Sequence, residues 1–335
     1  MTDHPGLEAM LAEMARQRGD ALATLDDPGP AAAAIAESAR RTGTLLLYAM
    51  GGSQHVNRIV APLYRALGLD ARTMIASAAL MAPLPDRART ALFLSQSGES
   101  GEIRALLARA AGAEERFALT LEPASTLARA VRAAIVATGG TEHAFAATRS
   151  IVLSLAMHGA VLERLGAPQP GLRAVLAAGA VADMRAAAAA LAGCDAYVVA
   201  GWHAMHGTAE SAALSLMELA RLPAIGFEGG QFRHGPFELL RPGIGVILLR
   251  SAGPDAALVP PTAAAVARTG ATLVVVDASG AAPVAEGVRV TLAPGAGLAA
   301  ATDMVLAFQE LNIAMARASI AQGIGTPRYT TKVTE

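Results

Sequence analysis

Hydroxyl and amide side chains are concentrated in LSQSGES, residues 94–100, directly after the apolar run TALF. A second loop of small residues, GGS, ends at Ser53 and follows the apolar run TLLLYAM. Hydroxyl donors and free backbone N–H groups at the start of a helix can bind a phosphate monoester. N-capping, for example by Ser97 or Ser100, explains one such loop equally well. Two such loops after neighbouring strands favour a phosphate site, although neither is a nucleotide-binding motif.

A carboxylate and two hydroxyls are spaced for one helix face in TAESAALSLMELAR, residues 208–221. Ser211, Ser215 and Glu218 stand at i, i+4 and i+7. The rest of this segment is apolar, so its polar stripe faces either solvent or a cavity. In a cavity, desolvation raises the proton affinity of Glu218 and suits it to removing a proton beside a carbonyl group. Aldose–ketose interconversion needs one such base.

Other reactive residue types give weaker signals. His203 and His206 in GWHAMHG are three residues apart without a clear third ligand, so we expect no metal site. Cys194 is the only cysteine, which excludes an intrachain disulfide, and we interpret it as a small apolar residue.

The composition excludes several protein classes. Of 335 residues, 53% are hydrophobic and 16% charged, yet no uncharged apolar run of about 18 residues predicts a membrane span. The N-terminal segment lacks the basic start and apolar run of a signal peptide, so we expect a cytoplasmic protein. A net charge of −1 without a basic stretch argues against nucleic-acid binding. The apolar excess predicts buried sheets and a subunit interface.

Apolar runs alternate with helical patterns, which predicts α/β architecture with parallel sheets covered on both faces. The predicted strands are 44–50, 72–77, 90–95, 116–122 and 133–138, and then 196–202, 224–229, 243–251, 271–278 and 287–293. The predicted helices are 6–25, 30–42, 55–68, 101–113, 125–132, 142–166, 171–193, 204–221, 234–240, 255–269 and 297–322. We therefore expect two doubly wound parallel-sheet domains in tandem. The expected boundaries are a helical segment at 1–42, domains at 43–168 and 169–320, and a tail at 321–335.

The segments GGS, LSQSGES, GTEHAFAATRS and GGQFRHGP resemble the sugar isomerase (SIS) domain family. The likeness extends over nearly the whole chain from about residue 8. The most similar pattern is the isomerase half of glucosamine-6-phosphate synthase and its stand-alone relatives, which include phosphosugar isomerases and a deaminase. The resemblance implies flavodoxin-like domains, no metal or organic cofactor, and a homodimer with shared active sites.

The resemblance also implies roles for individual residues. Glu218 matches the base that enolises the sugar, and His234 matches a histidine that opens the sugar ring from the partner subunit. Without the resemblance, His234 reads as a polar residue just before a helix that starts at Pro236. Lys332 matches a lysine of the tail, which otherwise reads as a frayed polar end. The residues implied to bind the phosphate are Ser53, Ser95, Gln96, Ser97 and Ser100, and those implied to line the sugar are Gly52, Phe145, Ala146 and Ser215.

The chain also departs from the synthase pattern. Ser215 replaces a lysine that forms an imine with a ketose, and Ser211 replaces an acid one turn earlier. We expect conversion of glucosamine 6-phosphate to fructose 6-phosphate and ammonia by enolisation. Deglycation of a fructosamine 6-phosphate and simple aldose–ketose isomerisation remain open. A phosphosugar sensor without turnover is the alternative of another class.

Overall fold

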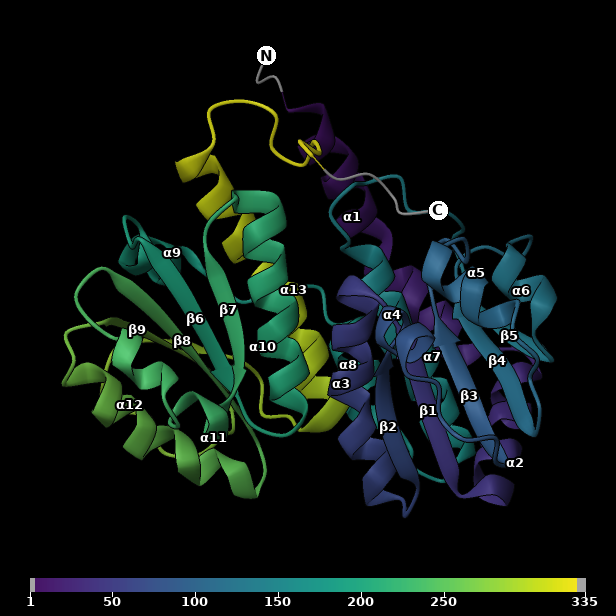
Figure 1. Ribbon diagram of the computed structural model, residues 1–335. Helices are drawn as coiled ribbons and strands as arrows, with labels where there is room; N and C mark the ends of the chain where they lie inside the picture. The colour runs from purple at the N-terminus through teal and green to yellow at the C-terminus, as the bar shows by residue number, and fades with distance from the viewer. Residues whose placement is uncertain (1–3, 330–335) are drawn as a thin grey trace. The chain divides into compact units, whose positions relative to one another are not determined.

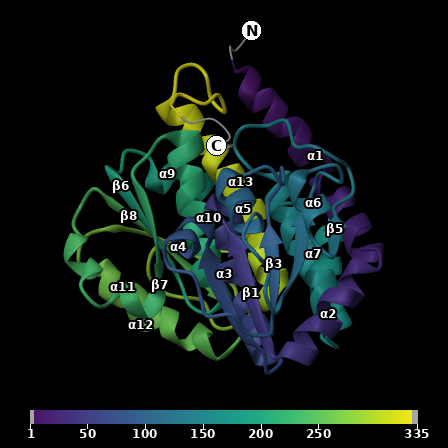
Figure 2. The same ribbon diagram turned by 45° about the vertical axis from the view of Figure 1, so that its right-hand side comes forward.

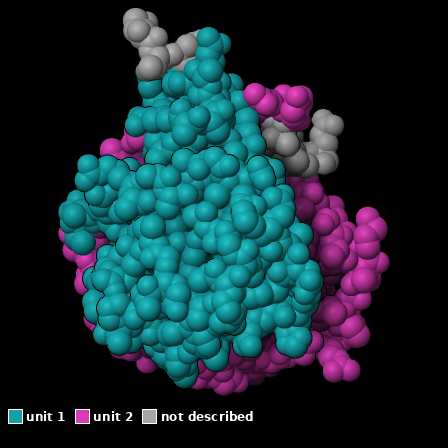
Figure 3. All heavy atoms as spheres, turned by 90° about the vertical axis from the view of Figure 1, so that its left-hand side faces the viewer, with its two compact units in different colours: residues 1–9, 178–326 teal, residues 10–177, 327–335 magenta. Residues whose placement is uncertain are grey.

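The computed structural model describes residues 4–329. The chain forms two compact units, which are coloured separately in Figure 3. Unit 1 comprises Ala178–Thr326 and the N-terminal residues through Ala9, and unit 2 comprises Met10–Ala177 and the chain from Pro327. Each unit has its own parallel sheet, as the sequence predicted.

The sheet of unit 2 has five parallel strands in the order β2-β1-β3-β4-β5 (Figures 1 and 2). Its strands are β1 (Thr44–Ala49), β2 (Asp70–Ile75), β3 (Arg89–Leu94), β4 (Glu114–Thr120) and β5 (Ala133–Val136). The last five residues of β1 and of β3 are buried, because the sheet is covered on both faces.

Helices cover both faces of this sheet. The helices of unit 2 are α1 (Pro5–Asp26, whose first residues belong to unit 1), α2 (Ala31–Thr42), α3 (Gly51–Ala66), α4 (Ala76–Met81), α5 (Gly101–Leu107), α6 (Thr126–Ala130), α7 (Arg149–Arg164) and α8 (Pro170–Ala177). Apolar residues of α4, α5 and α6 pack on Tyr48 and Phe93 of the strands. Helices α2 and α3 pack against α7.

Unit 1 repeats this topology, with the parallel strand order β10-β9-β8-β6-β7. Its strands are β6 (Ala196–Gly201), β7 (Ala224–Glu228), β8 (Ile244–Ser251), β9 (Thr272–Ala278) and β10 (Val288–Thr291). In each sheet the first strand in sequence lies between the second and the third. The predicted α/β class and repeated doubly wound architecture are therefore confirmed.

Helical segments also cover the sheet of unit 1. They are α9 (Arg185–Leu191), α10 (Ala204–Ser215), the π-helical turn η1 (Leu216–Ala220), α11 (Gly229–Phe232), the 3₁₀ turns η2 (Pro236–Leu239) and η3 (Pro254–Leu258), α12 (Val259–Ala267) and α13 (Gly297–Ser319). Helix α13 packs against α9, α10 and η1. Phe232 and the buried side of α12 pack in a core with β6, β8 and β9.

Several predicted helices differ from those observed. The helix predicted at 101–113 ends at Leu107, the one at 234–240 is the 3₁₀ turn η2, and the one at 255–269 begins with the 3₁₀ turn η3. Residues 142–148 are not helical, because the Glu142 side chain caps the start of α7. The predicted helix 171–193 is divided into α8 and α9, with irregular chain at 178–184. The predicted helix 204–221 changes to a π-helical turn after Ser215. The short helices α4 and α11 were not predicted, since runs of four to six residues carry little periodicity.

Within residues 4–329, no helix has both the length and the hydropathy required to cross a membrane.

Candidate functional site

The carboxyl ends of β1 and β3 form the topological switch point of unit 2. The chain leaves β1 towards β2 on one side, while β3 lies on the other side. Connections that diverge in this way leave a crevice beyond the strand ends, where doubly wound proteins bind ligands. The loops at these two ends are the GGS and LSQSGES segments.

A cavity of about 350 Å³ lies at this switch point. Its lining residues share small size and polar character: Met50, Gly51, Gly52, Ser53, Leu94, Ser95, Gln96, Ser97, Ser100, Glu102, Ala147, Ser150, Ile151 and Ser154. The structure thus brings together all five residues predicted to bind phosphate, with Gly52 beside them. The structure shows that these residues line one cavity. Their role as phosphate ligands stays a proposal.

The serine hydroxyls of this cavity do not cap the helices that follow them. Ser100 occupies the N-cap position of α5 and makes no side-chain cap hydrogen bond, and α3 begins after Met50 without one. Instead, the Gly98 N–H donates to Ser95 Oγ at 3.2 Å, and Ser95 Oγ lies 3.2 Å from Ser100 Oγ. The capping alternative therefore does not account for these hydroxyls.

The tight loop between β3 and α5 depends on Gly98. Its φ of 64° lies in the left-handed region, and a Cβ atom there would stand 2.3 Å from Ser125 Oγ. Glu99 holds the same loop to α6, because its carboxylate accepts a 2.6 Å hydrogen bond from the Thr126 N–H. That bond lowers the pKa of Glu99, so its carboxylate stays ionised.

The third wall of the cavity is the first turn of α7, which sequence reasoning did not include. Buried Glu142 accepts hydrogen bonds from the Thr148 N–H (3.0 Å), the Ser150 N–H (3.2 Å) and both of their hydroxyls. Gln96 Nε2 donates to the Glu142 carbonyl oxygen at 3.4 Å. Glu142 therefore orients Ser150 and is linked to the serine loop. Ser150 and Ser154 are four residues apart, a spacing that places two side chains on the same face of a helix and could have indicated this wall from the sequence.

A buried ion-pair network holds the chain before α7. The fully buried Arg149 pairs with Glu13 at 2.6 Å and Asp20 at 3.0 Å, and donates to the Gly140 and Thr141 carbonyl oxygens. Burial alone would raise the pKa of Glu13, but hydrogen bonds from the His143 N–H and Arg149 outweigh it and lower that pKa. Helix α1 is thus tied to the segment that presents Glu142.

Phe145 and Ala146 are not among the residues that line the cavity. Phe145 is half-buried and Ala146 is buried, and the wall is formed by the next residue, Ala147. Their predicted contact with a sugar remains a prediction.

In unit 1, Glu218 lies on the π-helical turn that continues α10. Its side chain reaches solvent, but the protein around it displaces enough water that desolvation raises the pKa of Glu218 to about 7. The π-helical turn changes the phase of the helix after Ser215. Ser211 is consequently buried and Ser215 half-buried, while Glu218 is exposed, so the single polar face expected from the sequence is not formed.

His234 stands in the turn between α11 and η2 and is exposed. Its backbone N–H donates to the Gln231 carbonyl oxygen at 3.0 Å. Its imidazole has no hydrogen-bond partner among residues 4–329, so both ring nitrogens are available.

Lys332 lies outside the described residues. The chain before it is held near the π-helical turn, because Arg221 donates to the Gly323 and Thr326 carbonyl oxygens at 3.0 and 3.1 Å. Arg221 itself ends the turn in a left-handed conformation, with a φ of 57°.

Other candidate residues do not gather into a site. In the described part of the chain, no group of three histidine, cysteine, aspartate or glutamate residues is placed to hold a metal ion. His206 lies 3.3 Å from Glu210, and Cys194 is half-buried.

Known proteins are similar to this chain in sequence and in fold. No protein-family model matches it. The glutamine–fructose-6-phosphate aminotransferase (isomerizing) of Bacillus subtilis is 28% identical over 247 residues, which cover 67% of this chain and 40% of that protein. The chain therefore matches about two fifths of this relative's length.

Solved structures also share the fold, as three of them illustrate. The C-terminal domain of glucosamine-fructose-6-phosphate aminotransferase from Francisella tularensis has a TM-score of 0.83 at 16% identity, covering 95% of this chain and 98% of that one. Tagatose-6-phosphate ketose/aldose isomerase from Escherichia coli has a TM-score of 0.79 at 18% identity, with 98% of both chains covered. Glucosamine-6-phosphate deaminase from Thermotoga maritima has a TM-score of 0.75 at 16% identity, covering 97% and 98%.

The serine loops surround a cavity at the switch point, the sheet topology occurs twice, and the sequence is related to isomerizing aminotransferases. The homology to these aminotransferases and the shared fold support an SIS (sugar isomerase) domain protein.

Proposed function

We propose that this protein is a phosphosugar isomerase and deaminase that converts glucosamine 6-phosphate to fructose 6-phosphate and ammonia. The observation that carries the proposal is the cavity of unit 2, whose serine hydroxyls are not used as helix caps. A phosphate monoester accepts hydrogen bonds from hydroxyl groups and from the free N–H groups that start α3.

Glu218 is the proposed base. A carboxyl group with a pKa of about 7 is partly ionised at neutral pH and binds an abstracted proton firmly enough to hold it until it is returned. His234 is proposed to open the sugar ring, by moving a proton between the C1 hydroxyl and the ring oxygen. Lys332 is proposed to approach the substrate from the tail.

The reaction balances without a cofactor. Glu218 takes the C2 proton of the open-chain aldehyde, leaving an enolamine across C1 and C2. Return of the proton to C1 gives an imine at C2. One water molecule hydrolyses the imine to a ketone and releases one ammonia.

Release rather than transfer of nitrogen is supported by Ser215. Ser215 is the last residue of α10, directly before the turn that carries Glu218, and its half-buried hydroxyl cannot form the imine with a ketose that a lysine would form. The likeness to a glucosamine-6-phosphate deaminase agrees with this reading, and the likeness to a tagatose-6-phosphate isomerase keeps simple isomerisation as the second candidate.

The test incubates the purified protein with glucosamine 6-phosphate and follows ammonia and fructose 6-phosphate together. Equal formation of both products, lost in Glu218→Gln, is the expected result. A panel of phosphorylated aldoses and of fructosamine 6-phosphate separates the isomerase and deglycase alternatives.

Saturable sugar-phosphate binding without turnover of any of these compounds would contradict the enzyme proposal and indicate a sensor. Binding by the Glu218→Gln protein, measured by calorimetry, shows whether a loss of turnover arises from the chemistry or from a lost site.

A further inference from the structure

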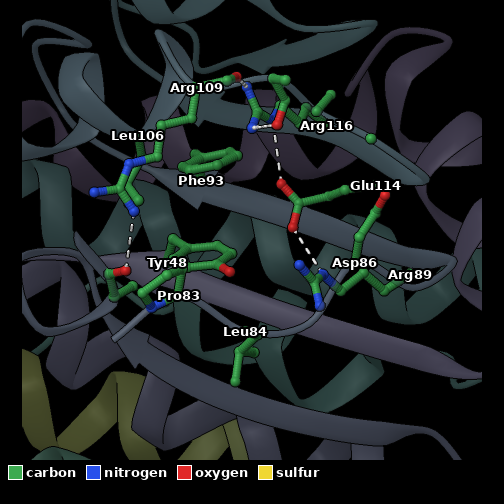
Figure 4. Close-up of a pocket in the computed structure, with 14 residues that line it drawn as sticks. Tyr48, Pro83, Leu84, Asp86, Arg89, Phe93, Leu106, Arg109, Glu114 and Arg116 are labelled. Atoms are coloured by element: carbon green, nitrogen blue, oxygen red, sulfur yellow. Dashed lines mark hydrogen bonds and ion pairs between the residues drawn. The ribbon is translucent and has the colours of Figure 1, made fainter. Parts of the chain in front are cut away.

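A second cavity, of about 230 Å³, lies on the face of the unit 2 sheet that α4 and α5 cover (Figure 4). The stacked rings of Tyr48 and Phe93 form part of its wall, with centroids 4.9 Å apart and planes 13° apart. Leu84 and Leu106 add apolar surface. The volume is below that of most sites for drug-sized ligands, so a ligand here is small.

The cavity has a surplus of positive charge. Three guanidinium groups line it with two carboxylates. Glu114 is held between Arg89 (2.9 Å) and Arg116 (3.1 Å), while Arg109 donates only to the Ala79 and Leu80 carbonyl oxygens. Figure 4 shows the Arg89–Glu114–Arg116 ion pairs on one side and Arg109 on the other. Such a site favours a monoanion over a neutral molecule.

The Tyr48 hydroxyl is a donor without an acceptor. Tyr48 is 5% exposed and lines the cavity, and its hydroxyl has no hydrogen-bond partner among the described residues. In Figure 4 this hydroxyl points towards the Arg89–Glu114 pair. Burial, with a smaller contribution from Glu114, raises the pKa of Tyr48 to about 12, so the group remains a donor at neutral pH. The hydroxyl reaches the cavity, where it can donate a hydrogen bond to a ligand oxygen.

We propose that this cavity binds a small organic monoanion with a flat apolar body, such as an aromatic carboxylate. The body packs on the Tyr48–Phe93 pair, the carboxylate accepts a hydrogen bond from the Tyr48 hydroxyl, and the charge of Arg109 across the cavity attracts the anion. The site is separate from the serine cavity, although Tyr48 and Phe93 stand two residues before Met50 and Ser95, which line that cavity.

Benzoate is the probe, benzyl alcohol its neutral counterpart, and inorganic phosphate the compact anion. Binding to the full chain is measured by calorimetry and by saturation-transfer NMR. We expect one benzoate per chain, with benzyl alcohol and phosphate binding at least about fivefold more weakly. Tyr48→Phe keeps the ring stack and should weaken benzoate binding about fivefold, the effect of one lost hydrogen bond. Arg109→Gln removes the surplus charge and should weaken it similarly.

Tyr329→Phe and Arg185→Gln are the matched controls, because both side chains are highly exposed and lie outside the cavity. They should leave benzoate binding unchanged. Lack of saturation up to about 10 mM benzoate, a range that includes weak millimolar sites, would overturn the proposal. Equal binding of benzyl alcohol, or unchanged affinity in both cavity variants with melting temperatures intact, would overturn it as well.

Discussion

At the scale of single residues, Glu218 combines solvent access with a pKa of about 7. These properties suit a general base, since the carboxylate can meet a substrate and still bind a proton strongly. The same desolvation has a stability cost. The folded-state pKa is above the usual value of 4.5, so ionisation of Glu218 disfavours the folded state increasingly as pH rises from about 4.5 to 7.

The first prediction concerns the pH dependence of turnover. If Glu218 is the base, kcat/KM for glucosamine 6-phosphate should rise with pH through an apparent pKa of about 7, because only the carboxylate accepts the C2 proton. Glu218→Gln should lower kcat by about 10²- to 10⁴-fold. Steady-state kinetics between pH 5.5 and 9 in roughly constant ionic strength provide the measurement.

Thermal melting of the same two proteins serves as the control. Glu218→Gln should melt higher than the wild type at pH 8 and about equally at pH 4, following the sign of the linkage. If the plot of kcat/KM against pH showed no inflection near 7, Glu218 would not be the base whose ionisation controls turnover.

The second prediction concerns Ser53, whose hydroxyl lines the first cavity and has no partner in residues 4–329. Ser53→Ala should weaken fructose 6-phosphate binding by about tenfold, the effect of losing one hydrogen bond to a charged phosphate. Fructose without phosphate should not distinguish the two proteins. Isothermal calorimetry measures both affinities.

Ser77→Ala is the matched control, since Ser77 lies on α4 in the same unit and outside the cavity. An equal effect of both substitutions would argue against a phosphate contact at Ser53.

At the scale of elements, the cavity depends on how α7 begins. Its first turn has two backbone N–H groups and two hydroxyls that donate to the Glu142 carboxylate. The helix therefore starts at Arg149, not at residue 142, and Ser150 faces the serine loop across the cavity. In unit 1 the π-helical turn also changes where a side chain points. Glu218 is exposed there, whereas Ser211 on the preceding helix is buried.

The third prediction tests this cap. Glu142→Ala leaves several buried donors unpaired, so it should lower the free energy of unfolding by about 2–4 kcal/mol. It should also weaken fructose 6-phosphate binding, since Ser150 loses the carboxylate that orients it. Urea unfolding and calorimetry measure the two effects.

Glu37→Ala, an exposed position on α2, provides the comparison. If Glu142→Ala were as stable as Glu37→Ala, the role of Glu142 as the cap of α7 would be wrong.

At the scale of the whole molecule, one strand order occurs twice, once in each unit. Unit 2 carries the serine cavity, and unit 1 carries Glu218 and His234. We propose that the protein acts as a homodimer in which His234 serves the active site of the partner subunit. This is the arrangement that the family resemblance implies.

The fourth prediction is a complementation test. Glu218→Gln and His234→Ala are each expected to be inactive alone. Each heterodimer of the two would contain one intact site of its two if His234 serves the partner, so the purified heterodimer should recover about half of the wild-type activity. Co-expression with two affinity tags and assay of the doubly purified species provide the measurement. A mixture as inactive as its parents would show that each site uses its own His234.

The sequence by itself determined all the strands of both sheets, their parallel α/β class and the residues of the serine loops. Those features depend on local patterns: apolar runs that become buried strands, and small polar residues where a strand ends. Tertiary structure alone decided the third wall of the cavity, where buried Glu142 orders Ser150, and the break between α8 and α9. It also decided the π-helical turn at Glu218 and the unpaired hydroxyl of Tyr48. Those features depend on contacts between residues far apart in the chain or on the packing around one side chain. Such contacts produce no periodic pattern of apolar and polar residues in the sequence.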